Sequence, residues 1–246
     1  MKIIQSIAGL AFILFFVSCG EPPADEYAPN AVNDDKTSTV ENVLTQEERD
    51  ALSPEDVLEQ LKEGNRRFVE NDLTPRNFSA QVTNSTDGQY PKAVVLSCLD
   101  SRVPVEHIFD RGIGDIFVGR VAGNFINDDL LGSMEFGCKV AGAKLILVLG
   151  HEHCGAIKSA IDDVELGNIT GMLKNIKPAV EKVAYDGDRS SNNEDFVHMV
   201  CKSNVKHTME QIRSRSSILN EMEQEGQIKI IGGIYNMSTG EVEFME

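Results

Sequence analysis

Residues 93–102 have the sequence AVVLSCLDSR, and this stretch decides the fold. Its first half is a short apolar, β-branched run, typical of a strand buried on both faces of a parallel sheet. Its second half carries a thiol, a carboxylate and a guanidinium group. Residues 145–154, LILVLGHEHC, repeat this design with two imidazoles, a carboxylate and a thiol. Because sites in open parallel sheets form outside the carboxyl ends of the strands, the two stretches predict one sheet and one site.

The rest of the chain alternates between strand and helix patterns. Further strands are predicted at 115–119, 229–235 and 242–244, the last as an edge strand. Helices are predicted at about 54–70, 128–141, 155–162 and 203–224. The first helix has a capping-box start in Ser53-Pro54-Glu55-Asp56. This alternation predicts an α/β fold with a central, predominantly parallel β-sheet flanked by helices.

The composition is that of a globular protein with an acidic bias. The 246 residues are 41% hydrophobic and 25% charged, which is sufficient for a large buried core. The formal net charge of −16 argues against a nucleic-acid-binding surface, so no nucleic-acid partner is expected. Five cysteines are too few for a disulfide-built fold, and their odd number excludes complete pairing within one chain.

The first 18 residues have the features of a secretory signal. Lys2 is followed by an apolar run over 7–17 and a small-residue exit. That run is too short to span a bilayer, which takes about 20 apolar residues. Residues 16–19, FVSC, resemble a bacterial lipobox, in which processing leaves Cys19 as a lipidated first residue. We predict a signal peptide over 1–18 and a lipid anchor at Cys19. The alternatives are a plain cleaved signal and an apolar N-terminal helix.

The segment after Cys19 is predicted to be a flexible, acidic tether. From Gly20 to Gln60 the chain has 12 acidic residues and two basic ones. Such a segment cannot bury enough surface to offset its ordering entropy. We assign residues 19–48 to the lipidated cysteine and its tether, and residues 49–246 to the folded domain. The expected location is the bacterial cell envelope, on a periplasmic or surface-facing membrane.

The polar ends of the two core strands have the ligand types of a zinc site. His151 and Cys154 are three residues apart on a predicted turn into a helix, so both can reach one ion. Cys98 and Asp100 alternate on an extended tip and project to the same side. Thiolate, carboxylate and imidazole groups together suit a tetrahedral zinc ion. The alternative is a pair of core cysteines beside a surface histidine.

The same residues resemble the motif of the β-class carbonic anhydrases. Cys98-x-Asp100-x-Arg102 is followed about fifty residues later by His151-x-x-Cys154. The resemblance implies Zn²⁺ held by Cys98, His151 and Cys154. It also implies that Asp100 and Arg102 form a catalytic pair.

The resemblance extends over about residues 52–246. Gln89 lies nine residues before Cys98, where the family has its substrate-binding glutamine. Some bacterial members use a tryptophan at an inhibitory bicarbonate site, and this chain has no tryptophan. Because the family's active sites lie where two subunits meet, a homodimer or a higher even oligomer is expected.

The reaction implied by the resemblance is the reversible hydration of carbon dioxide to bicarbonate and a proton. Zinc can lower the pKa of a bound water from 15.7 to about 7, which provides a hydroxide nucleophile. Asp100 would accept a hydrogen bond from that hydroxide, and Arg102 would hold Asp100 in a bidentate pair. Without Arg102, Asp100 would be free to become the fourth zinc ligand and close the site.

Two other functions fit the same residues. A carbon disulfide or carbonyl sulfide hydrolase would direct the same nucleophile at a different linear, electrophilic carbon. A non-catalytic zinc- or bicarbonate-binding module would keep Asp100 on the metal. Arg102 and Gln89 argue against the second alternative, because a closed structural site needs neither.

Overall fold

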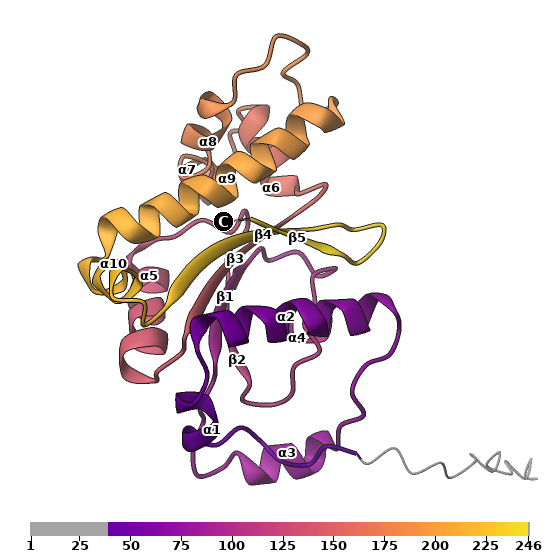
Figure 1. Ribbon diagram of the computed structural model, residues 1–246. Coiled ribbons are helices and arrows are strands. Elements are labelled where there is room, and N and C mark those ends of the chain that lie inside the picture. The colour runs from indigo at the N-terminus through magenta and orange to yellow at the C-terminus, as the bar shows by residue number, and fades with distance from the viewer. Residues whose placement is uncertain (1–38, 246) are drawn as a thin grey trace, which may run out of the picture. The chain divides into compact units, whose positions relative to one another are not determined.

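The computed structural model describes residues 39–245. Its centre is a five-stranded sheet with the strand order β2-β1-β3-β4-β5 (Figure 1). The strands are β1 (Ala93–Ser97), β2 (Ile116–Arg120), β3 (Leu145–His151), β4 (Lys229–Tyr235) and β5 (Val242–Met245). The first four are parallel, and β5 pairs with β4 in the antiparallel sense. The predicted α/β fold with a predominantly parallel sheet is confirmed, and each predicted strand is present to within two residues at its ends.

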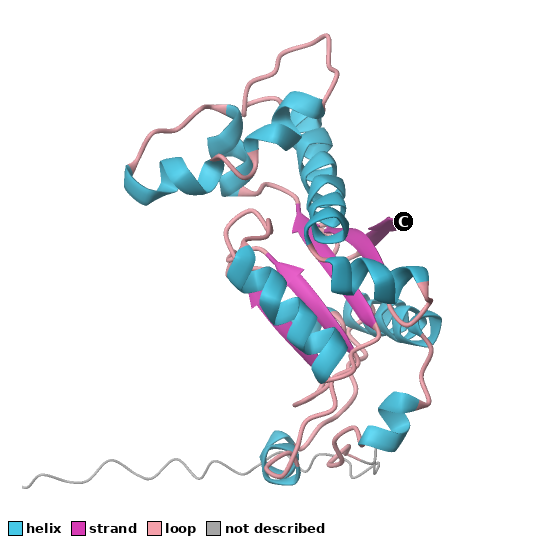
Figure 2. Cartoon of the chain, turned by 90° about the vertical axis from the view of Figure 1, so that its left-hand side faces the viewer, coloured by secondary structure: helices cyan, strands magenta, loops and turns pink. Residues whose placement is uncertain are grey.

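Helices cover both faces of the sheet (Figure 2). Before β3 they are α1 (Gln46–Asp50), α2 (Pro54–Val69), α3 (Phe78–Asn84), α4 (Val105–Ile108) and α5 (Asp128–Glu135), which continues into a π-helical turn, η1 (Phe136–Val140). After β3 they are α6 (Gly155–Ile161), α7 (Gly167–Leu173), α8 (Lys177–Lys182), α9 (Glu194–Arg215) and α10 (Ser217–Gln224). In α2 the predicted capping box is present, with Ser53 and Asp56 each bonded to the other's backbone N–H.

Two apolar cores form on the two faces of the sheet. Alternate residues of a strand point to opposite faces, so β1 supplies Val94 and Leu96 to one core and Ala93 and Val95 to the other. The first core includes residues of α5, α6, α9 and α10, and the second includes residues of α2 and α4. Every residue of β1 and β3 is buried, which explains why both were apolar without alternation.

The long helix predicted at 203–224 is wrong in its extent. The structure has two helices there, and the first, α9, begins nine residues earlier than predicted, after the N-cap Asn193. Ser216 separates them in an extended conformation, and its hydroxyl accepts a hydrogen bond from the Leu219 N–H at the start of α10. The apolar periodicity continues across Ser216, so periodicity alone did not reveal the break.

The described part of the chain begins within the segment predicted as a tether. The Val40 N–H donates to the Pro75 carbonyl, and the Val40 carbonyl accepts from Asn77. Thr45 then caps α1. Residues 40–48 therefore contact the folded domain. The predicted signal peptide, Cys19 and the rest of the tether lie outside the described residues. None of the described helices is both long and apolar enough to cross a membrane.

Candidate metal centre

The ends of β1 and β3 bring three buried side chains together. Ser97 is in register with Leu149, so both strands finish at the same edge of the sheet. Cys98 follows β1 directly, His151 ends β3, and Cys154 is the N-cap of α6. Their ligand atoms all lie within 4.8 Å of one another. The two sequence stretches therefore meet at one site, as their polar ends predicted.

The geometry of the three residues fits a tetrahedral zinc ion. The two thiol sulfurs are 3.9 Å apart. Zn–S bonds of about 2.3 Å at a tetrahedral angle place two sulfurs about 3.8 Å apart. His151 Nδ1 donates to the Glu152 carbonyl at 2.8 Å, which leaves the lone pair on Nε2. Nε2 is buried and has no hydrogen-bond partner among the described residues. A buried imidazole nitrogen with a free lone pair beside two thiols is a set of ligand atoms that fits a zinc ion.

Among the four described thiols, Cys98 alone has a lowered pKa. The Cys154 thiol, then His151 and the Gly123 N–H, lower the pKa of Cys98 against the opposing effect of burial. Cys154 keeps its own proton, because its hydrogen bond to Cys98 and burial raise its pKa. Burial raises the pKa of Cys138 and of Cys201 to about 12. Cys98 is thus the thiol prepared to bind a cation.

Asp100 and Arg102 form an ion pair beside the thiols. Arg102 Nε and Nη2 donate to the two carboxylate oxygens of Asp100, at 2.9 and 2.7 Å, and the Arg102 N–H donates as well. This bidentate contact lowers the pKa of Asp100 to about 2, so the carboxylate is ionised at neutral pH. Asp100 Oδ2 is 3.9 Å from His151 Nε2. The carboxylate is therefore close enough to compete for the metal and is held by arginine instead.

Gln89 lies away from the other predicted site residues. It is exposed and precedes β1, whereas Cys98 follows β1. A strand rises about 3.3 Å per residue, so Ala93 and Cys98 are roughly 16 Å apart. Gln89 therefore lies at the opposite end of the strands from Cys98 and does not line the metal centre of its own chain.

One contributor to the site was missed at the sequence level. The Gly123 N–H donates to Cys98 Sγ at 3.3 Å. Gly123 has a φ of 83°, and a Cβ at this position would collide with the Ile176 side chain. Gly123 lies three residues after the end of β2, just as Cys154 lies three residues after the end of β3. A glycine shortly after a predicted strand was the sequence feature that could have identified this residue.

Comparison with known proteins assigns the chain to a family. A carbonic anhydrase family model matches residues 93–242. Carbonic anhydrase 2 of Mycobacterium tuberculosis is 37% identical over 188 residues, which cover 73% of this chain and 87% of that protein. The chain belongs to the β-class carbonic anhydrases. A carbonic anhydrase of Mycolicibacterium smegmatis is 35% identical over 187 residues, covering 74% and 89% of the two chains. The enzyme therefore catalyses the reversible hydration of carbon dioxide.

Solved structures agree with this carbonic anhydrase assignment. The β-carbonic anhydrase CcaA superposes with a TM-score of 0.62 at 25% identity, covering 76% of this chain and 87% of that one. A Coccomyxa β-carbonic anhydrase in complex with acetazolamide gives a TM-score of 0.58 at 24% identity, covering 76% and 85%. The second comparison supports the fold alone.

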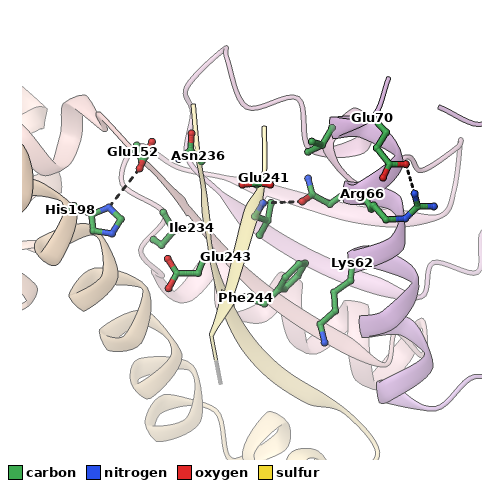
Figure 3. Close-up of a pocket in the computed structure, with 13 residues that line it drawn as sticks. Lys62, Arg66, Glu70, Glu152, His198, Ile234, Asn236, Glu241, Glu243 and Phe244 are labelled. Carbon is green, nitrogen blue, oxygen red and sulfur yellow. Dashed lines mark hydrogen bonds and ion pairs between the residues drawn. The ribbon is translucent and has the colours of Figure 1, made fainter. Parts of the chain in front are cut away.

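A separate cavity of about 590 Å³ lies between α2 and the β4–β5 hairpin of the enzyme (Figure 3). Lys62 and Arg66 of α2 line one side. Glu152 and His198 line another, with 3.9 Å between Glu152 Oε1 and His198 Nδ1. None of the predicted ligands or catalytic residues lines this cavity, so it is distinct from the metal centre.

Proposed function

We propose that this carbonic anhydrase holds one zinc ion with Cys98, His151 and Cys154 and keeps the fourth position free through the Asp100–Arg102 pair. The observation that carries the proposal is the sulfur–sulfur distance of 3.9 Å beside His151 Nε2, which accepts no hydrogen bond from any residue within 39–245. When bound, zinc supplies the Lewis acidity that makes water a nucleophile near neutral pH.

Asp100 is the hydrogen-bond acceptor that orients the attacking water. As an ionised carboxylate it can only accept hydrogen bonds, and Arg102 leaves a lone pair on Oδ2, which lies 3.9 Å from His151 Nε2. Arg102 donates into both carboxylate oxygens and so keeps Asp100 from taking the free ligand position. In a closed state without this restraint, Asp100 would be the fourth ligand.

Gln89 binds bicarbonate at the site of a second copy of the chain. It lies too far from its own Cys98 to do so in one chain. Two features favour a second copy near the site: Leu99, beside the ligand Cys98, is 67% exposed, and β2 is an edge strand whose residues are only partly buried. Two β-carbonic anhydrases of Sordaria macrospora with the same fold, at 20% identity and a TM-score of 0.58, are tetrameric. A homodimer or higher even oligomer would bring Gln89 to the partner's metal centre.

The metal site is tested by measuring zinc content. Wild-type protein is expected to retain one zinc per chain, and Cys154→Ser to lose it together with hydration activity, since a hydroxyl replaces a thiolate poorly. Cys138→Ala is the matched control, because it removes a buried thiol that lies outside the ligand cluster. Full zinc occupancy in Cys154→Ser would overturn the assignment.

The role of Gln89 is tested by mixing two defective variants. Gln89→Ala and Arg102→Ala are purified separately and then allowed to exchange subunits. If Gln89 acts on the partner's site, each mixed dimer regains one intact site, and about a quarter of wild-type activity returns at equal amounts. If Gln89 acts within its own chain, mixing restores nothing, and if it has no role, Gln89→Ala alone is as active as wild type.

We also propose that the enzyme is a bacterial cell-envelope lipoprotein anchored through Cys19. A basic start, a short apolar run and a cysteine at its exit support this. Stable anchoring takes more than one acyl chain, each worth about 0.8 kcal/mol per buried methylene. Cys19→Ala should move the protein from the membrane fraction to the soluble fraction with activity per zinc unchanged, while Cys138→Ala should remain in the membrane fraction. Retention of Cys19→Ala in washed membranes would contradict the anchor.

A further inference from the structure

Three polar residues on one face of α9 contact the turns that carry the metal centre. Cys201, Asn204 and Thr208 follow the spacing i, i+3 and i+7, which places them along one side of a helix. All three are at least 97% buried. A polar stripe inside an otherwise apolar core costs free energy unless each group has a partner there.

The first contact is to the turn that carries two of the ligands. Cys201 Sγ donates to the His151 carbonyl at 3.5 Å. The turn ends at Cys154 and passes through His153, which has a φ of 53°. A left-handed conformation is unfavourable for a residue other than glycine, and it persists only where the surroundings enforce it. The hydrogen bond from Cys201 to the His151 carbonyl helps to hold this turn in place.

The second contact is to the turn that supports the third ligand. Asn204 Nδ2 donates to the Gly123 carbonyl at 2.8 Å, and Thr208 Oγ1 donates to the Asn124 carbonyl at 3.3 Å. Gly123 and Asn124 have φ values of 83° and 41°. The N–H of Gly123 points at Cys98 Sγ. The hydrogen bonds of α9 therefore hold the turn whose N–H donor faces the Cys98 sulfur.

The amide of Asn204 destabilises the core in which it lies. Its Oδ1 is buried and has no hydrogen-bond partner among the described residues. An unsatisfied buried acceptor costs about 1–3 kcal/mol, so a leucine of similar size would suit the core better. The hydrogen bond from Asn204 Nδ2 to the Gly123 carbonyl therefore offers a functional reason for an amide at this position.

We propose that Asn204 and Cys201 are positioning residues for the metal centre: Asn204 aims the Gly123 N–H at Cys98, and Cys201 fixes the turn between His151 and Cys154. This inference rests on the proposed zinc site and adds to it a helix that sets the ligand geometry. Cys201 contacts a ligand residue directly, and Asn204 acts through Gly123. Groups that hold metal ligands in place are typically worth 10–100-fold in metal affinity.

The test compares full-length Asn204→Leu with Ser203→Ala. Ser203 is the matched control because its hydroxyl donates to the Ala179 carbonyl at 2.8 Å, away from the centre but from the same helix. Zinc affinity is measured by chelator competition, and the cobalt-substituted protein reports thiolate bonding through its charge-transfer absorption. Asn204→Leu should bind zinc 10–100-fold more weakly with an altered cobalt spectrum. Ser203→Ala should match wild type in both.

A second pair of variants keeps the proposal testable if Asn204→Leu does not fold. Cys201→Ser retains a donor for the His151 carbonyl and should stay within about threefold of wild-type affinity, whereas Cys201→Val should lose about tenfold. The proposal is overturned if Asn204→Leu or Cys201→Val binds zinc as wild type does, or if Ser203→Ala loses as much as they do. Failure of the zinc site itself would look different, because wild-type protein would then bind no zinc or keep it in Cys154→Ser.

Discussion

Asp100 and Asp110 are two carboxylates whose pKa values are both held at about 2, yet they belong to different kinds of site. Asp110 is fully buried, and its oxygens accept from Arg67, Thr74 and Arg76. Asp100 has one arginine, Arg102, which is 57% exposed. Burial opposes ionisation of Asp110, and its three partners overcome it.

The comparison teaches that a lowered carboxyl pKa does not by itself mark an active site. The Asp110 cluster ties α2 and the 70–76 loop to the end of α4, and all four acceptor positions of the carboxylate are used. Asp100 accepts three hydrogen bonds, which leaves one lone pair unused on Oδ2, 3.9 Å from His151 Nε2. An unused acceptor position near the candidate metal ligands is what separates the carboxylate proposed to act in catalysis from the structural one.

The largest expected effect is on stability, at Asp110. Asp110→Asn leaves two arginines facing a neutral amide and should lower the free energy of unfolding by about 3 kcal/mol. Asparagine tolerates the positive φ of this position, so the backbone is not the cause. Chemical denaturation of the zinc-loaded protein measures it. Activity per zinc should be unchanged, and a loss of activity in folded protein would erase the distinction between the two carboxylates.

The next effect is on rate, at Arg102. Arg102→Ala should keep its zinc but lose about 100-fold in hydration rate, equivalent to about 2.7 kcal/mol of barrier, because Asp100 becomes free to occupy the fourth ligand position. Stopped-flow hydration with measured zinc content tests this. Activity within about threefold of wild type would contradict the role of the pair.

A smaller effect is expected from acid. The pKa of Asp110 is lower in the folded protein than in the unfolded chain, so its stabilisation is complete above about pH 4 and is lost as the pH falls toward 2. The loss attributable to this group is about 2 kcal/mol. Unfolding free energies measured between pH 5 and 2 should fall less steeply in Asp110→Asn than in wild type. An equal pH dependence of the unfolding free energy in the two proteins would show that the arginines do not lower the pKa of Asp110.

The smallest effect is expected at Thr74. Thr74→Val removes the hydroxyl that donates to Asp110 Oδ2 at 2.6 Å but keeps the backbone N–H that donates to Oδ1. The expected loss is about 1.5 kcal/mol of unfolding free energy, the usual size for one hydrogen bond to a charged group. Thermal unfolding of Thr74→Val, measured in parallel with wild type and Asp110→Asn, gives this loss. A loss equal to that of Asp110→Asn would mean that the cluster acts as one unit rather than as separate donors.

The strands and ligands were predictable because local sequence determines them. The apolar runs of β1 and β3 are buried on both faces, and parallel strands end at one edge, so Cys98 and His151 had to approach. Gln89 shows the limit of that reasoning. It is close to Cys98 in sequence, but an intervening strand carries the chain to the other edge. The contacts of Asn204 with Gly123 depend on how α9 packs, which no local pattern encodes.

The register of β1 against β3 has a consequence for how the enzyme acquires its metal. Cys98 lies after one strand and His151 at the end of the other, so no single segment of the unfolded chain holds the complete donor set. The proposed zinc ion can be bound by all three residues only once these two strands lie side by side, and its binding would then stabilise their pairing. Release of zinc should therefore accompany, and report, the parting of the two central strands.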